Sequence, residues 1–161
     1  MAKQHIVLCG DSIIDNGSYV NQGELDVAGQ VQEELPDSKV TLLAVDGNVT
    51  EDIEDQMNNL PKDATHIFIS IGGNDGYNRM DVFDESANTI GDAMEPLYEM
   101  RNEFEIDYNK MLKNVLSYGV PTTLCSIYYP RYVEAVSQAL RKYLGGKTFV
   151  SKITQSCGIR V

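Results

Sequence analysis

The sequence predicts a doubly wound α/β domain, with a parallel sheet of four to five strands and helices on both faces. Short apolar runs alternate with longer segments of helical periodicity, a pattern typical of parallel strands joined by crossover helices. The strand candidates are apolar at nearly every position, as expected for strands that are covered on both faces. No repeat or linker divides the chain, so residues 1–161 are expected to form a single domain.

Taken in order, the apolar runs place strands at residues 4–10, 39–45, 65–71 and 122–127, and residues 158–161 have the pattern of a fifth strand. The first helix, 24–35, is expected to end at Pro36 because proline cannot continue a helix. Thr50 is a good N-cap for a short acidic helix that reaches Leu60. A long helix over 89–118, interrupted near Pro96, is followed by helices at 132–143 and 148–156.

The composition excludes several classes of function. The formal net charge of -11 and the pI near 4.5 disfavour binding to nucleic acid or to anionic lipid. No apolar run approaches the roughly 20 residues of a membrane span, and residues 1–5 do not resemble a signal peptide. Three cysteines without metal-ligand spacing indicate reduced thiols in a cytoplasmic protein, and two isolated histidines argue against a metal site.

Three of the expected strands end in small, turn-forming residues: Gly10-Asp11-Ser12, Asp46-Gly47-Asn48 and Gly72-Gly73-Asn74-Asp75. Taken alone, Gly10-Asp11-Ser12 predicts only a turn or a helix cap. In a parallel sheet, however, the three strand ends lie at one edge, where ligands bind. The hydroxyl of Ser12, the backbone at Gly47 and the amide of Asn74 would together provide a nucleophile and oxyanion-hole donors.

These three motifs, in this order and each at a strand end, resemble those of the SGNH, or GDSL-type, serine hydrolases. The resemblance covers roughly residues 3–129. It implies a flavodoxin-like sheet and an esterase, lipase or deacetylase acting on a small ester, with no metal and no cofactor. It also implies that Ser12 is the nucleophile and that Ser12, Gly47 and Asn74 form the oxyanion hole, with Gly10, Asp11 and Asp75 in support.

The sequence departs from this family at its end. The family's late Asp-x-x-His motif, which supplies the general base, is missing, because no histidine follows His66. We therefore interpret the chain as a truncated member of the family. His5 precedes Ser12 by seven residues, or roughly 20 Å of strand, and His66 is equally remote from the loop at Asn74. The general base is thus unknown.

Nearby carboxylates do not replace the missing histidine. Asp11, Asp15 and Asp75 are expected to make turn and cap hydrogen bonds, and a carboxylate with an ordinary pKa near 4 is a poor base for a serine hydroxyl. We expect a preformed nucleophile turn with weak or no turnover. Residues 158–161 resemble only the beginning of a fifth strand, so the edge of strand 122–127 is expected to stay open, which predicts a homo-oligomer.

Two alternatives remain open from the sequence. The first is a catalytically inactive binding module that uses the same cleft to hold an acyl or sugar ligand. The second is a flavodoxin-like binder of a nucleotide or flavin, because turns at strand ends can hold phosphate at helix N-termini. The second is disfavoured by the acidic charge and by the absence of a P-loop lysine and of the G-x-G-x-x-G motif.

Overall fold

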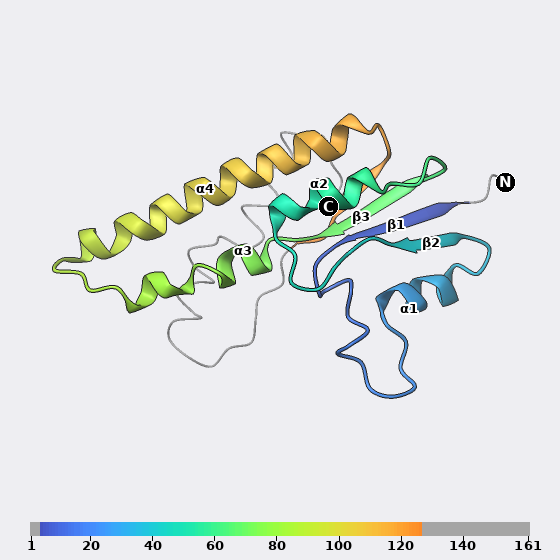
Figure 1. The fold of residues 1–161 in the computed structure, drawn as a ribbon, viewed down its shortest axis with the longest axis horizontal. Helices are drawn as coiled ribbons and strands as arrows, with labels where there is room; N and C mark the ends of the chain where they lie inside the picture. Colours follow the sequence, from blue (N-terminus) through green and yellow to red (C-terminus); the bar gives the residue numbers. More distant parts are fainter. Residues whose placement is uncertain (1–3, 127–161) are drawn as a thin grey trace.

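A computed structural model describes residues 4–126 of the chain. Four parallel strands form one sheet in the order β2-β1-β3-β4 (Figure 1). The elements are β1 (His5–Gly10), α1 (Val27–Glu34), β2 (Lys39–Leu42), the 3₁₀ turn η1 (Thr50–Asp52), α2 (Ile53–Asn58), β3 (His66–Ser70), α3 (Gly73–Tyr77), the 3₁₀ turn η2 (Met80–Asp84), α4 (Ile90–Ser117) and β4 (Thr122–Leu124).

The sheet is covered on both faces, which confirms the predicted doubly wound α/β fold. Successive residues of β1 point to opposite faces. Ile6 and Leu8 pack with the residues of α1, whereas Val7 and Cys9 lie in a larger core beneath α2 and α4. In Figure 1, α4 and α2 lie on one side of the strands and α1 on the other. All six residues of β1 are buried, so β1 is the central strand around which both layers are built.

The strand register brings the carboxyl ends of β1 and β3 level with each other. Val7 pairs with Ile67, and Gly10, the last residue of β1, pairs with Ser70, the last residue of β3. The chain therefore leaves both strands at the same edge of the sheet. This edge carries the candidate site.

The long helix α4 supports the sheet through one apolar stripe, as its periodicity predicts. Its buried residues are Met100, Tyr108, Met111, Leu112 and Val115. Phe104, also predicted in this stripe, packs against the same core with its ring centroid 5.4 Å from that of Tyr108.

The interruption predicted near Pro96 is wrong, because α4 continues from Ile90 to Ser117 with Pro96 inside it. A reciprocal capping box holds the turn before the proline. The Thr89 hydroxyl accepts from the Asp92 N–H, and the Asp92 carboxylate accepts from the Thr89 N–H, both at 3.1 Å. Cap and core contacts together offset the hydrogen bond that proline cannot make.

Several other boundaries differ from the expectation. Helix α1 begins at Val27 because the Asp26 carboxylate caps it by accepting from the Gly29 N–H at 2.7 Å. Strand β2 stops at Leu42, since the ladder is interrupted where the Leu43 and Ala44 N–H groups both donate to the Leu8 carbonyl. Thr50 is not an N-cap but the first residue of η1.

Residues 72–76, expected to form only a glycine-rich turn, begin the short helix α3. Strand β4 ends at Leu124. The helices predicted at 132–143 and 148–156 and the fifth strand at 158–161 lie outside the described residues.

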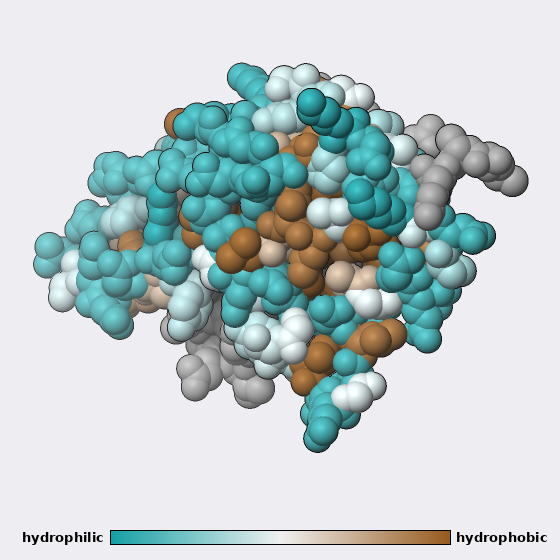
Figure 2. Space-filling view, turned by 45° about the vertical axis from the view of Figure 1, so that its right-hand side comes forward, coloured by the Kyte–Doolittle hydropathy of each residue, from teal (hydrophilic) through white to brown (hydrophobic). Residues whose placement is uncertain are grey.

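The face of the molecule in Figure 2 is mostly hydrophilic, with hydrophobic residues gathered through its middle. Among residues 4–126, no helix combines the length and the apolar character needed to cross a membrane.

Candidate active site

The turn after β1 presents Ser12 at the carboxyl edge of the sheet. The Asp11 N–H donates to the Ser70 carbonyl at 3.1 Å, which ties the start of the turn to β3. The buried Asp11 carboxylate then accepts from the Ile13 N–H at 3.0 Å, and the Asp11 carbonyl accepts from the Ile14 N–H at 3.0 Å. Ser12 lies between these bonds and is half-buried. Asp11 therefore makes the turn hydrogen bond predicted for it and holds the backbone on both sides of Ser12.

The loop after β2 is bonded directly to this turn. The Val45 N–H donates to the Gly10 carbonyl at 3.1 Å, and the Asp46 N–H donates to the Asp15 carboxylate at 2.9 Å. Gly47 follows with a φ of +84°, a conformation that L side chains rarely adopt. These bonds carry Gly47 to the edge at which Ser12 lies.

The loop after β3 is bonded to the second loop. Gly72, with a φ of +114°, turns the chain into α3. The Asn74 side-chain amide donates to the Asn48 carbonyl at 2.9 Å, and the Asp75 carboxylate accepts from the Thr50 N–H at 3.1 and 3.2 Å. An asparagine amide carries two N–H donors. One of them donates to the backbone carbonyl of Asn48 and holds Asn74 against the second loop.

The structure thus brings all the predicted site residues to one edge: Gly10, Asp11, Ser12, Gly47, Asn74 and Asp75. The convergence of the three loops is now an observation. Their catalytic roles stay predictions.

Several carboxylates lie at this edge, and the pKa values of Asp11 and Asp75 are raised above the ordinary value near 4 assumed for them. Burial raises the pKa of Asp11, and the negative charge of Asp75 adds to the effect, although the bond from Ile13 opposes it. Burial also raises the pKa of Asp75, against hydrogen bonds from Thr50 that lower it. At the rim, Tyr19 donates to the Asp46 carboxylate at 2.7 Å, which raises the Tyr19 pKa. Asp11 and Asp75 are committed to backbone N–H groups, so neither is placed as a free base.

The two histidines lie at the opposite edge, as their distance along the strands predicts. His5 begins β1 and is only 2% exposed. One ring nitrogen is 2.9 Å from an Asp63 carboxylate oxygen and the other is 2.8 Å from the Thr41 hydroxyl. The hydrogen bond with His5 lowers the pKa of Asp63. His66, at the start of β3, contacts the Thr65 hydroxyl at 3.0 Å. Both histidines therefore lie away from the Ser12 turn of the same chain.

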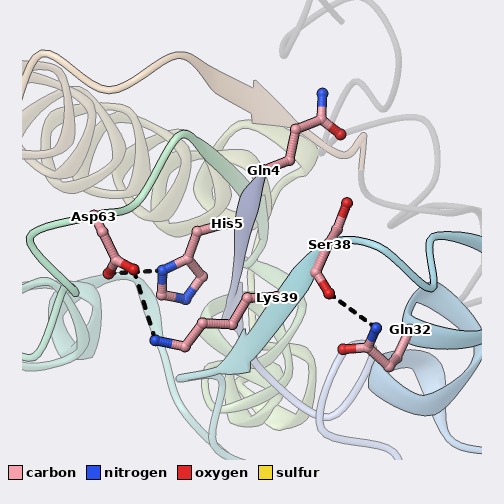
Figure 3. Close-up of a pocket in the computed structure, with 6 residues that line it drawn as sticks. All are labelled: Gln4, His5, Gln32, Ser38, Lys39 and Asp63. Carbon is pink, nitrogen blue, oxygen red and sulfur yellow. Dashed lines mark hydrogen bonds and ion pairs between the residues drawn. The ribbon is translucent and has the colours of Figure 1, made fainter. Parts of the chain in front are cut away.

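A cavity of about 330 Å³ lies beside His5 at this amino edge (Figure 3). Its lining is polar, and the carboxylate of Asp63 faces both the His5 ring and the Lys39 ammonium. The lining residues are Gln4, His5, Gln32, Ser38, Lys39 and Asp63. The cavity is remote from the serine turn and is not part of the candidate site. Within residues 4–126, no group of three or more histidine, cysteine, aspartate or glutamate side chains could hold a metal ion.

Sequence reasoning missed Gln56. This α2 residue is 5% exposed, and its amide contacts Gly10 and Asn48. The available signal was its position, because Gln56 lies on the same buried stripe as Ile53 and Met57. A polar residue on an otherwise apolar helix face needs buried partners.

A serine turn at the carboxyl edge of a parallel α/β sheet, with two further loops bonded around it, is an arrangement that suits a serine hydrolase. The chain belongs to the GDSL-like lipase/acylhydrolase family, whose model matches residues 8–146. No curated protein sequence matches the chain.

Solved structures of similar fold include AlinE4, an esterase of the SGNH-hydrolase family, with a TM-score of 0.66 and 14% identity over 99% of this chain and 75% of that chain. Phospholipase A1 from Streptomyces albidoflavus NA297 gives a TM-score of 0.67 and 17% identity, over 98% of this chain and 78% of that chain. The acetyl xylan esterase AlAXEase gives a TM-score of 0.64 and 16% identity, over 96% of this chain and 74% of that chain. At these identities the likeness shows the shared SGNH-hydrolase fold.

Proposed function

We propose that this chain is a carboxylic-ester hydrolase in which Ser12 is the nucleophile. The backbone N–H groups of Ser12 and Gly47 and the side-chain amide of Asn74 form the oxyanion hole. The observation that carries this proposal is the hydrogen bonding of three loops around the carboxyl edge of the sheet. Membership of the GDSL-like lipase/acylhydrolase family supports ester chemistry, as do the structural relatives named as esterases and a phospholipase.

In the proposed reaction, the Ser12 oxygen bonds to the carbonyl carbon of the ester while its proton passes to a base. The carbonyl oxygen gains a negative charge, which the three N–H donors stabilise until the ester C–O bond breaks and the base returns the proton to the leaving alcohol. Water then attacks the acyl-serine and releases the acid. Loss of one oxyanion donor typically costs about 10²–10³-fold in rate, so the placement of Gly47 and Asn74 contributes to the rate in addition to the nucleophile Ser12.

The proton acceptor of the proposed reaction is not identified among residues 4–126. His5 and His66 lie at the amino edge, and no histidine follows His66 in the sequence. A general base must lie within about 3 Å of the hydroxyl, directly or through one water. We therefore expect slow turnover, because no histidine of residues 4–126 supplies the general-base catalysis that typically contributes about 10²–10⁴-fold.

The test is hydrolysis of p-nitrophenyl acetate by the chain and by its Ser12→Ala variant. The proposal predicts a slow rate above the buffer background that Ser12→Ala abolishes. Thr41→Ala, which removes a hydroxyl at the opposite edge, is the matched control and should keep that rate. Equal rates for the chain and the Ser12→Ala variant would contradict the proposal.

The second candidate is a binding module that holds an ester or acyl ligand without turnover. It is favoured by one observation, the location of both histidines at the amino edge of the sheet. Saturable binding of a non-hydrolysable ester analogue, unchanged in Ser12→Ala and without any Ser12-dependent hydrolysis, would favour this second candidate.

A further inference from the structure

The buried side chain of Gln56 joins the nucleophile strand to the second loop. Its carbonyl oxygen accepts from the Gly10 N–H at 2.8 Å. Its amide nitrogen donates to the Gly10 carbonyl at 2.8 Å and to the Asn48 side-chain oxygen at 2.7 Å. A glutamine amide offers one carbonyl oxygen and two N–H donors. The acceptor and both donors are thus used within the site.

The same chain of bonds continues to the third loop. The backbone carbonyl of Asn48 accepts from the Asn74 side-chain amide at 2.9 Å. Gly10 precedes Ser12 by two residues, and Asn48 directly follows Gly47. One path of hydrogen bonds, from Gly10 through Gln56 and Asn48 to Asn74, therefore connects the nucleophile turn with both of the other oxyanion donors.

The orientation of this amide is determined by its partners. Gly10 offers it one donor and one acceptor, and the Asn48 side-chain oxygen accepts from its nitrogen, so a rotated amide would place like groups against one another. An apolar residue between Ile53 and Met57 would fill the same buried stripe but would leave the Gly10 N–H without this partner. Packing alone does not account for a glutamine at this position.

We propose that Gln56 is a positioning residue that sets the spacing between the Ser12 turn and the oxyanion donors at Gly47 and Asn74. The inference rests on the proposed function. Gln56 does not itself touch the reacting atoms. A displacement of about 1 Å within a reacting constellation can cost about 100-fold in rate, and functional groups need placement within about 0.5 Å. The length of the Gln56 side chain therefore sets the distance between Gly10 and Asn48, on which the Ser12 turn and the Gly47 loop depend.

The test uses Gln56→Met, which keeps the approximate volume but removes all three bonds. We expect the Ser12-dependent kcat for p-nitrophenyl acetate to fall by about 10-fold or more, with KM nearly unchanged. We also expect the resonance of the Asn74 side-chain amide to move in a nitrogen–proton correlation spectrum. Ile53→Val, a packing change on the same helix face, is the control for lost stability. When its urea midpoint is similar to that of Gln56→Met, it should change neither the kcat nor the Asn74 resonance.

Asn48→Ala provides a second variant if Gln56→Met does not fold. It removes the Gln56–Asn48 bond, leaves both bonds to Gly10 intact, and should also lower kcat and move the Asn74 resonance. Rates and spectra equal to those of Ile53→Val would overturn the inference. If the unmodified chain shows no Ser12-dependent reaction, the proposed function fails. The Asn74 resonance then decides separately, because a shift would support the positioning role of Gln56 and an unmoved resonance would overturn it.

Discussion

The α-carbon of Gly10 faces the carbonyl of Ser70 so closely that a β-carbon on Gly10 would lie 1.9 Å from that oxygen. Gly10 also has a φ of +131°, where L side chains are strained. The two strands that carry the nucleophile turn and the Asn74 loop can approach at their ends only because residue 10 has no side chain. The convergence of the site thus depends on backbone contact at Gly10.

Gly10→Ala should therefore destabilise the protein strongly. The added methyl group would meet a backbone carbonyl that cannot move without separating β1 from β3, so we expect a loss of at least about 3 kcal/mol in the free energy of unfolding, or failure to fold. The free energy of unfolding is measured by urea denaturation, monitored by circular dichroism. Gly23→Ala is the control, because Gly23 has a φ of +91° but open space around it. Similar losses in both variants would show that the close contact adds nothing to the conformational strain.

Asp11→Asn should stabilise the protein at neutral pH. Because burial raises the pKa of Asp11, the folded protein binds this proton more tightly than the unfolded chain does. The free energy of unfolding then falls as the pH rises from the unfolded pKa, near 4, through the raised folded pKa. Asparagine removes this loss and keeps an oxygen for the Ile13 N–H. Urea midpoints from pH 4 to pH 7 should decline more steeply for the natural sequence. Parallel pH profiles would contradict the assignment.

Asn74→Ala should lower the Ser12-dependent rate by about 10²–10³-fold, because it removes one oxyanion donor. The variant also loses the bond to the Asn48 carbonyl, so part of the effect comes from loosened loops. Asn78→Ala, at the exposed end of the same short helix, is the matched control and should keep the rate. An Asn74→Ala rate within about twofold of the natural rate would exclude Asn74 from the oxyanion hole.

His5→Gln should reduce stability without affecting the reaction. The buried ring bridges Asp63 and Thr41, and loss of such hydrogen bonds typically costs about 1–3 kcal/mol. Because His5 lies at the amino edge, the Ser12-dependent rate of folded protein should change by less than about twofold. The measurement pairs urea denaturation with the ester assay. A lost rate in fully folded His5→Gln protein would instead show that this histidine serves as the base, for example from a second copy of the chain.

The fold and the convergence of the three loops were predictable from the sequence because their signals are local. An apolar run such as 6–9 predicts a buried strand, a glycine after it predicts a turn, and parallel topology brings such turns to one edge. The 3₁₀ start at Thr50 and the uninterrupted passage through Pro96 were not predictable, because tertiary contacts and caps override local preference there. Gln56 was missed for a related reason. Its partners, Gly10 and Asn48, are identifiable only once the strands and α2 are packed together.

The proposed function requires a preformed site around Ser12, and no histidine of residues 4–126 lies beside it to act as the base. Its most direct test is chemical rescue with 2-methylimidazole, an added base whose methyl group hinders direct attack on the ester. The rate for p-nitrophenyl acetate is measured against the base concentration for the natural chain and for Ser12→Ala. We predict a steeper dependence for the natural chain, by at least about 10-fold after subtraction of the buffer rate, because the added base can take a proton from Ser12 only where the hydroxyl is present, and general-base catalysis typically contributes about 10²–10⁴-fold. Identical slopes for the two proteins would show that Ser12 is not a poised nucleophile and would contradict the account.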